Sequence, residues 1–188
     1  MSDDAARETT HKEPGQDSAV PVGDVVLAAA VERFPAAVAE HSHGQPVLHI
    51  GAAEWLELAR WLRDEEQFTQ CVDITAVDQL LQPNRPLPPG VSPERFEVVA
   101  NFLSHPRNRR LRAICQVAEG AEVDSLFDIY PGVELPEREV YDLFGVRFAG
   151  HPDLSRLLMP DDWEGHPLRK DDPPAWVPVQ FKEAPAPQ

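Results

Sequence analysis

Acidic and histidine side chains, the usual acid–base groups and metal ligands of proteins, gather in the last third of the chain. They stand between residues 137 and 171, where a short charged segment is followed by a long polar one. A polar segment of this kind buries little apolar surface, so it predicts a rigid domain before it and a partner surface to lie on. The candidates are Glu137, Glu139, His151, Asp153, Asp161, Asp162, Glu164 and His166.

The spacing of these residues does not match known catalytic or metal-binding patterns. His151 and His166 are far apart in sequence, and no HExxH pattern or calcium-loop pattern accompanies them. Glu137 and Glu139 are two positions apart on an expected helix, so they point to different sides and cannot face one substrate as an acid–base pair. There is also no glycine-rich phosphate loop and no GxSxG. The residues alone therefore predict no catalytic, cofactor or metal residue.

Length and composition predict one domain with extensions. The chain has 188 residues and 20 prolines, and its net charge of −15 argues against binding nucleic acid. It lacks a run of 18 apolar residues and a basic-then-apolar start, so we expect a soluble cytoplasmic protein that does not insert into a membrane. Cys71 and Cys115 are isolated, too few for an iron–sulfur cluster, and are predicted to be buried and inert.

Apolar periodicity predicts helices early in the chain and a β-hairpin later, which favours an α+β two-layer sandwich of helices on a mixed β-sheet with an extended C-terminal arm. In the helix over 52–66, Trp55 and Trp61 are assigned to the core. The expected elements are a helix over 23–40 redirected at Pro35, strands over 45–50, 68–77, 95–103 and 111–117, a proline-rich loop over 80–93, and a short helix or turn over 121–130.

These elements divide the chain into three parts. Residues 1–22 are predicted to form a disordered N-terminal tail, residues 23–149 the α+β domain, and residues 150–188 an extended partner-binding arm with a proline-rich tail. The turn of the hairpin carries three arginines, Arg107, Arg109 and Arg110. This basic cluster is interpreted either as a solvated hairpin tip or as a contact with an acidic partner.

A short charged helix precedes the arm. Pro136 fits the first helical position, where its missing N–H costs nothing, and Gly145 fits the end of the helix. Arg138 and Asp142 are four positions apart, so we expect them to pair on one face. Leu135 is expected to cover the core together with Val140, Leu143 and Phe144.

This region carries a specific resemblance. The run Glu137-Arg-Glu139-x-x-Asp142-Leu-Phe-Gly145, then Gly150-His-Pro-Asp153 and Glu164-Gly-His-Pro-Leu-Arg-Lys-Asp171, resembles the signature of the C subunit of bacterial NADH-quinone oxidoreductase, respiratory complex I. The resemblance extends over most of residues 23–174. The matching motif positions are Glu137, Arg138, Glu139, Asp142, Gly145, Gly150, His151, Pro152, Asp153, Glu164, Gly165, His166, Pro167, Arg169, Lys170 and Asp171.

The resemblance implies a peripheral-arm subunit that lacks a cofactor and catalytic residues of its own and is needed for assembly. The FMN, iron–sulfur clusters, NADH and quinone of the proton-translocating complex would be bound by other subunits. Partners would be subunits D, B and I of the same complex; the arm would wrap over the first of them, which contributes the quinone site. The chain would lie on the cytoplasmic side of the cell membrane as a peripheral protein. The motif residues would have packing and interface roles.

Two alternatives remain open. Equivalent subunits serve membrane-bound hydrogenases and other quinone-linked dehydrogenases, and the same motifs would fit those assemblies. The second alternative is a stand-alone metal-dependent enzyme that uses the histidines and acidic residues of the arm. The sequence also departs from the family pattern at Ser155, where the family usually has the first of two arginines.

Overall fold

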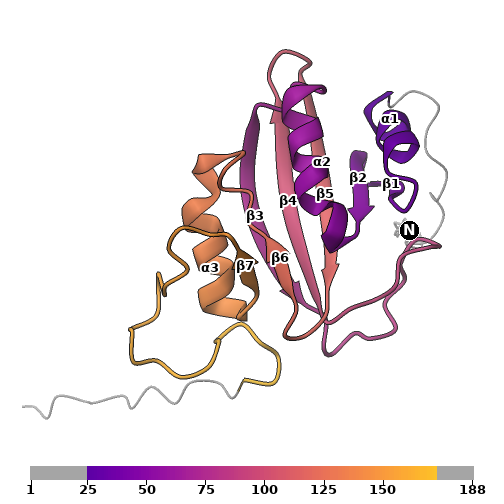
Figure 1. The fold of residues 1–188 in the computed structure, drawn as a ribbon. Coiled ribbons are helices and arrows are strands. Elements are labelled where there is room, and N and C mark those ends of the chain that lie inside the picture. Colours follow the sequence, from indigo (N-terminus) through magenta and orange to yellow (C-terminus); the bar gives the residue numbers. More distant parts are fainter. Residues whose placement is uncertain (1–24, 173–188) are drawn as a thin grey trace, which may run out of the picture.

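The structure, a computed structural model, describes residues 25–172, so the predicted tails over 1–22 and beyond residue 172 lie outside the described residues. Five strands form one sheet in the order β1-β2-β5-β4-β3, and α1 and α2 lie on one of its faces (Figure 1). The elements are α1 (Val25–Arg33), β1 (Val38–Ser42), β2 (Gln45–Ile50), α2 (Ala52–Asp64), β3 (Gln70–Asp78), β4 (Phe96–Ser104), β5 (Arg109–Val117), β6 (Glu122–Asp124), the 3₁₀ turn η1 (Pro131–Val133), α3 (Glu134–Phe144) and β7 (Arg147–Ala149).

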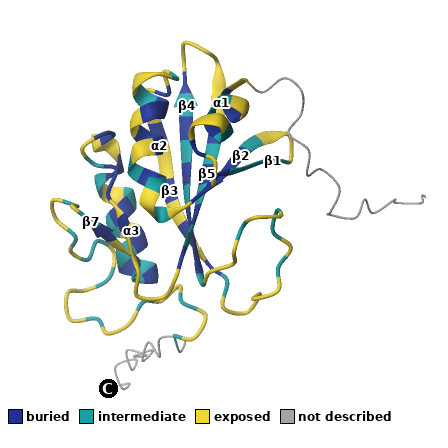
Figure 2. Cartoon of the chain, turned by 45° about the vertical axis from the view of Figure 1, so that its right-hand side comes forward, coloured by how far each residue is buried: buried dark blue, intermediate teal, exposed yellow. Residues whose placement is uncertain are grey.

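The predicted α+β class with a mixed sheet is confirmed. Strands β2 and β5 pair in parallel, and the other pairs of the large sheet are antiparallel. The face toward the helices is apolar because alternate residues of β4 and β5, such as Val98 and Ala113, point into the core. Trp55 and Trp61 of α2 are buried there, as predicted, and Figure 2 shows the buried stripe of α2 turned toward the strands. Cys71 and Cys115 are buried as well, and burial raises the pKa of each thiol to about 12.

The helix predicted over 23–40, interrupted or redirected at Pro35, ends at Arg33 and does not resume, so the prediction is wrong for residues 34–40. Phe34 precedes Pro35, and a residue before proline is pushed out of the helical conformation. The chain then runs as β1 and returns as β2 through a two-residue turn, in which His43 and Gly44 both have positive φ angles of 53° and 76°. Two such residues make the tight turn that matches the twist of antiparallel strands. The residues predicted as the end of the helix therefore form the first strand of a hairpin at the edge of the sheet.

The prediction of a short helix or turn over 121–130 is wrong at Glu122–Asp124, which form strand β6, and is confirmed by the turn at residues 127–129. β6 pairs in parallel with β7, and Val123 lies opposite Phe148 in that pair. A pairing partner so far along the chain leaves no local periodic signal. The small sheet and α3 continue the helical layer beyond β3, which α3 contacts.

Helix α3 starts earlier than predicted. It begins at Glu134, directly after η1, so Pro136 is its third residue and not its first. The proline is still harmless, because the first four N–H groups of a helix have no partner inside it. Leu135 points outward and is 52% exposed, because its spacing from the buried Val140 and Phe144 places it on the other side of the helix. This contradicts its predicted core role. The predicted end is confirmed, since Gly145 caps α3 with a φ of 73°.

Candidate functional site

Two carboxylates of α3 are fully buried and point to different neighbours. Glu137 and Asp142 are each 0% exposed, although ionisable side chains are almost never fully buried unless they have partners. Glu137 contacts the turn after β6, and Asp142 contacts the polar segment after β7. That segment, residues 150–172, is called the arm below; it passes under α3 toward the lower end of the sheet (Figure 1).

Asp142 anchors the middle of the arm. Its Oδ2 accepts the consecutive backbone N–H groups of Leu157, Leu158 and Met159 at 3.0, 2.7 and 2.8 Å. Its Oδ1 accepts a hydrogen bond from Arg156 Nη1 at 2.8 Å. Consecutive N–H groups that point to one spot form an anion-binding nest, here filled by a carboxylate of the same chain. We call Asp142, Arg156 and residues 157–159 the Asp142 cluster.

The electrostatics of this cluster favour the charged carboxylate. Burial alone would raise the pKa of Asp142, but the N–H groups of residues 157–159 and the Arg156 guanidinium outweigh it and lower the pKa to about 2. Arg156 in turn donates from Nη2 to the carbonyl oxygens of Trp163 and Gly165, at 2.7 and 3.0 Å. One buried aspartate and one arginine therefore set the path of residues 156–165.

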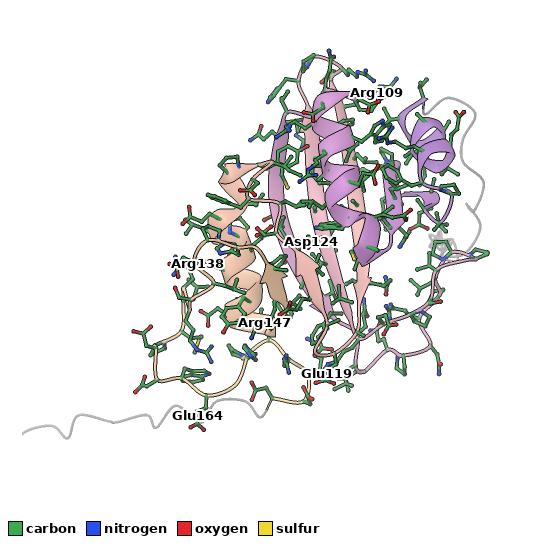
Figure 3. All side chains as sticks on the ribbon, viewed as in Figure 1. Arg109, Glu119, Asp124, Arg138, Arg147 and Glu164 are labelled. Carbon is green, nitrogen blue, oxygen red and sulfur yellow. The ribbon has the colours of Figure 1, made fainter. Side chains whose placement is uncertain are left out.

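Arg138 does not pair with Asp142, so that prediction is wrong. The Asp142 side chain is turned into the Asp142 cluster. Arg138, one helical turn earlier, points toward the arm, as Figure 3 shows. Its Nη2 donates to Ser155 Oγ at 2.8 Å and to the carbonyl oxygen of Arg156 at 2.9 Å. Its Nη1 lies 3.6 Å from Asp153 Oδ2. Two residues of the Glu-Arg-Glu-x-x-Asp motif thus hold the same part of the arm by separate contacts.

The C-terminal end of α3 is capped by the arm. His166 Nδ1 lies 2.9 Å from the carbonyl oxygen of Asp142, and Arg169 Nε donates to that of Phe144 at 2.6 Å. Both side chains supply hydrogen bonds to carbonyls that have no partner within the helix, and the arginine also suits the negative end of its dipole. A Cβ on Gly145 would lie 2.5–2.6 Å from atoms of Arg169 and His166. The motif glycine is therefore required for its positive φ and for this close contact.

A second buried cluster fixes the end of the arm to the large sheet. The Asp78 side chain is 0% exposed, and it accepts hydrogen bonds from Arg95 Nη2 at 3.1 Å and from the backbone N–H of Lys170 at 2.8 Å. Arg95 also contacts Asp171 of the arm and lies 2.8 Å from Glu119. We call Asp78, Arg95, Glu119 and residues 170–171 the Asp78 cluster.

Glu137 has a different environment. Its Oε2 accepts a hydrogen bond from Ser125 Oγ at 2.5 Å, and its Oε1 accepts the backbone N–H of Leu126 at 2.8 Å. Burial raises its pKa, and these two hydrogen bonds only partly offset the effect. Glu137 thus fixes the turn between β6 and η1, and it carries the opposite pKa shift to Asp142 on the same helix.

This opposite shift predicts a pH effect for Glu137→Gln. A carboxyl whose folded pKa is raised stabilises the fold at acid pH, and this contribution is lost as the pH rises from the ordinary value of 4.5 through the raised value. The amide cannot ionise, so the variant should lose less stability than the wild type between pH 4.5 and neutral pH. Urea denaturation at a series of pH values measures this, and parallel curves for both proteins would contradict it.

The remaining motif residues lie mostly on the outside. His151 Nε2 lies 3.0 Å from the carbonyl oxygen of Glu134, and its Nδ1 accepts the N–H of Asp153 at 3.1 Å, so both ring nitrogens contact backbone groups. Gly150 and Gly165 have φ angles of 80° and 87° and allow turns of the arm. Glu164 projects from the outer edge of the arm in Figure 3. The other exposed motif residues are Glu139, Pro152, Asp153, Pro167, Lys170 and Asp171.

Sequence reasoning missed Asp78, Arg95, Ser125 and Arg156. One signal was present for the buried carboxylates. Glu137 falls on the same helical stripe as Val133, Val140 and Phe144, and a carboxylate on an apolar stripe indicates a buried acceptor that needs donors. No comparable sequence pattern marks Asp78, Arg95, Ser125 or Arg156, because these four residues lie outside α3, in other parts of the chain.

Two features are absent from residues 25–172. No helix in this range is long and apolar enough to cross a bilayer. Within the same range, no three histidine, cysteine or acidic side chains are grouped so that they could hold a metal ion.

Fold and clusters together define an α+β module with a polar arm anchored on it by two buried carboxylates. The family described as "Respiratory-chain NADH dehydrogenase, 30 Kd subunit" matches residues 48–175. The chain belongs to this family, and the resemblance to the C subunit of NADH-quinone oxidoreductase is confirmed.

Individual relatives agree with this assignment. The NADH-quinone oxidoreductase C subunit of Rhodopseudomonas palustris (strain BisB18) is 42% identical over 156 residues, which cover 81% of this chain and 71% of that protein. The corresponding subunit of Geobacter sulfurreducens is 38% identical, and the match covers 76% of this chain and 84% of that protein. The match to the corresponding subunit of Salinispora tropica, at 40% identity, covers 77% of this chain but only 56% of that protein. The chain therefore spans little more than half the length of some relatives.

A solved structure shows the same fold. It is described as Nqo5, a trypsin-resistant fragment comprising residues 1–134 of that protein. It aligns with a TM-score of 0.59 at 28% identity and covers 68% of this chain and 98% of the fragment.

Proposed function

We propose that this chain is a peripheral-arm subunit of proton-translocating NADH:quinone oxidoreductase that promotes assembly and carries no catalytic residue. Electron transfer from NADH to quinone belongs to the whole complex, with FMN, iron–sulfur clusters and quinone bound by other subunits. The chain packs on the quinone-site (D) subunit, near the B and I subunits, on the cytoplasmic side of the membrane. The observation that carries this proposal is the family match over residues 48–175, which includes most of the domain and the arm.

The contacts of the motif residues support a packing role over a catalytic one. The buried motif carboxylates, Glu137 and Asp142, already have donors within the chain. His151 and His166 contact backbone carbonyls. Asp142 and the two histidines order the arm, and Glu137 orders the turn after β6. Groups held in this way are not positioned to transfer a proton to a substrate.

The surface of the arm supports a docking role. Leu158 and Leu168 are 60% and 44% exposed although they lie in a segment held in place by the clusters. Exposed apolar side chains on an ordered, polar segment are suited to the core of a protein interface with a polar rim. An arm that is ordered before docking also loses less conformational entropy on binding. We therefore assign the outer side of the arm to the contact with the quinone-site subunit.

Purification of the complex through a tag on another subunit tests the proposal. Mass spectrometry of the active, intact complex should find this chain in equal amount to the tagged subunit. An active complex that lacks the chain would refute the proposal.

The packing role also predicts how two variants separate assembly from turnover. Arg138→Ala and Asp142→Ala should lower the amount of assembled complex more than they lower quinone reduction per assembled complex, because both side chains hold the arm. Asp161→Ala, an exposed position on the same arm, serves as the control. Normal yield of a complex without turnover would instead indicate a catalytic role.

A further inference from the structure

The face of the sheet opposite the helices is only partly covered. At its lower end the loop between β3 and β4 lies over it, and Arg85 of that loop donates to Glu97 Oε1 at 3.0 Å and to Gln116 Oε1 at 2.7 Å. Toward the β4–β5 turn this face has no such cover within the described residues. Half-buried Val99, Leu103 and Ile114 point to this side between the polar positions.

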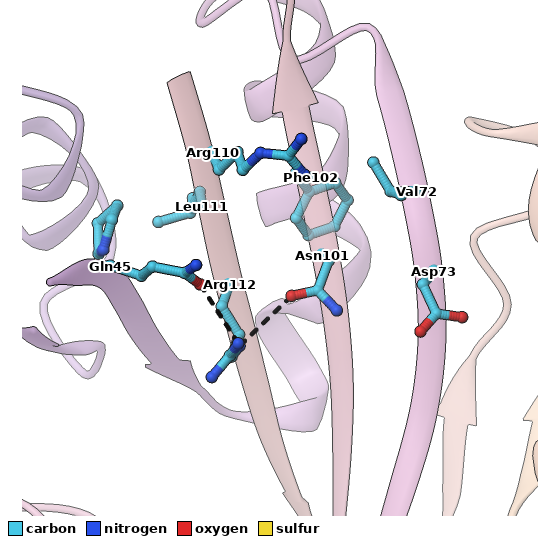
Figure 4. Close-up of a pocket in the computed structure, with 9 residues that line it drawn as sticks. Gln45, Val72, Asp73, Asn101, Phe102, Arg110, Leu111 and Arg112 are labelled. Atoms are coloured by element: carbon cyan, nitrogen blue, oxygen red, sulfur yellow. Dashed lines mark hydrogen bonds between the residues drawn. The ribbon is translucent and has the colours of Figure 1, made fainter. Parts of the chain in front are cut away.

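The uncovered end holds a pocket of about 320 Å³, which we call the outer-face pocket. Figure 4 shows it with β3, β4 and β5 running next to one another and with Arg112 and Asn101 side by side. Arg112 Nη2 lies 3.3 Å from Gln45 Oε1, and Arg112 Nε lies 3.3 Å from Asn101 Oδ1. These amides orient the guanidinium without neutralising its charge. The pocket is lined by Gln45, Pro46, Val72, Asp73, Asn101, Phe102, Arg110, Leu111 and Arg112.

The charge of the pocket differs from that of the chain. The chain carries −15, yet the lining has two arginines and one aspartate, Asp73. Arg95 and Arg156 have carboxylate partners in the buried clusters. Among residues 25–172, by contrast, neither Arg110 nor Arg112 forms an ion pair, and the Arg110 side chain is exposed. A guanidinium presents a planar fork of donors that matches a carboxylate, so this pair lacks the anion that it is suited to bind.

We infer that the outer-face pocket receives an acidic segment of a partner subunit, with a carboxylate on Arg110 and Arg112. The inference rests on the proposed function for the identity of the assembly. Charge complementarity indicates the kind of occupant. The positive charge of the pocket attracts an acidic polypeptide, and the overall charge of −15 of the chain repels nucleic acid. Val72 at the pocket and Val77 further along β3 are 45% and 40% exposed, and they extend the surface beyond what a small anion would cover. Of the three arginines at the hairpin turn, Arg110 lines this pocket, whereas Arg107 pairs with Glu66.

Arginine labelling tests whether the pocket is occupied. Phenylglyoxal should modify Arg110 and Arg112 readily in the purified full chain and slowly in the intact complex. Arg60, exposed on α2 at the opposite face, is the matched control. Equal reactivity of the two arginines in the chain and in a complex that contains the chain would overturn the inference and leave the proposed function intact. Absence of the chain from the complex would instead overturn the proposed function.

Cross-linking tests the chemistry of the occupant. A photoreactive phenylalanine analogue in place of Leu103, on the same face, should cross-link in the intact complex to a segment rich in aspartate or glutamate. Cross-links only to segments without a carboxylate would overturn the inference. A second outcome would also overturn the inference: the arginines are protected from phenylglyoxal, dialysis removes this protection, and no cross-link forms. That outcome would favour a small carboxylic acid as the occupant.

Charge reversal gives the expected size of the effect. Arg110→Glu combined with Arg112→Glu should lower the amount of chain recovered with the complex by about tenfold at limiting expression, whereas Arg60→Glu should not. Replacing the cross-linked aspartate or glutamate of the partner subunit by lysine should restore the amount of the double variant that is recovered with the complex. If the double charge-reversal variant folds normally by circular dichroism and assembles at the wild-type level, the role of the two arginines is refuted.

Discussion

Asp142→Ala is expected to lower the free energy of unfolding of this chain by about 3–5 kcal/mol, because removing one member of a buried ion pair leaves its partner without compensation. Arg156 would lose its carboxylate, and three consecutive N–H groups of the arm would lose their acceptor. The gain in helix propensity from alanine is about 0.7 kcal/mol at most, so it cannot offset the loss. Urea denaturation at pH 7 measures the difference.

The same variant should release the arm. Trypsin cuts after arginine in exposed, mobile backbone, and Arg156 is fixed at present by Asp142, Trp163 and Gly165. Cleavage after Arg156 should therefore be faster in Asp142→Ala than in the wild type under native conditions. Asp153→Ala is the control, since Asp153 is 62% exposed and its pair with Arg138 should contribute no more than about 1 kcal/mol. Equal stability and equal cleavage in Asp142→Ala and Asp153→Ala would contradict the role of the Asp142 cluster.

The stabilisation by Asp142 depends on pH in a defined direction. Its folded pKa of about 2 lies below the ordinary value of 3.8, so its contribution is present above pH 3.8 and is lost as the pH falls through about 2. The difference in stability between the wild type and Asp142→Ala should shrink over that range.

Arg95→Met is expected to cost about 3 kcal/mol, because Asp78 would remain as a buried carboxylate without a cation. Methionine keeps most of the aliphatic length of the side chain, but it also removes the guanidinium whose Cζ lies 4.9 Å from the centroid of the Phe96 ring. The backbone N–H groups of Leu80 and Lys170 still donate hydrogen bonds to Asp78 in this variant. The loss of free energy of unfolding is therefore expected at the low end of the range for a broken buried ion pair.

A matched exposed pair provides the control for Arg95. Arg147 lies 2.8 Å from Glu122, and these side chains are 63% and 51% exposed. Arg147→Met should change the free energy of unfolding by no more than about 1 kcal/mol, as is usual for surface pairs. The deficit of Arg95→Met should shrink as the pH falls from 3.8 through the lowered pKa of Asp78, because the carboxyl that Arg95 stabilises then becomes protonated in the folded wild type as well. Similar losses for Arg95→Met and Arg147→Met would rule out a special role for the buried pair.

The two clusters act on different parts of one segment. The Asp142 cluster holds residues 156–159, and the Asp78 cluster holds residues 170–171 against the large sheet. Between them His166 and Arg169 cap α3. The arm is thus ordered on its own domain, and the partner surface that the sequence also predicts stays a prediction. The proposed docking on the quinone-site subunit then needs only the outer side of an already ordered arm.

The main elements of the domain could be predicted from the sequence. α2 and the β4–β5 hairpin follow from apolar periodicity and turn residues, which act between neighbours in the chain. Gly145 was identified as the end of α3 for the same reason, because the left-handed conformation of a helix cap is a local requirement. The motif in α3 and the arm led to the correct family from the residues alone.

The partners of the motif residues were decided only by the tertiary structure. Spacing favoured Arg138 as the partner of Asp142, yet burial turned that carboxylate to Arg156 and to the nest of N–H groups. A pairing four residues apart is worth only a few tenths of a kcal/mol, whereas leaving a buried carboxylate without donors costs several. The larger energy determines the geometry, and it depends on which distant residues the fold brings together. For that reason the sequence showed that residues 137–171 form a unit, and only the folded chain showed that Asp142 and Asp78 hold it in place.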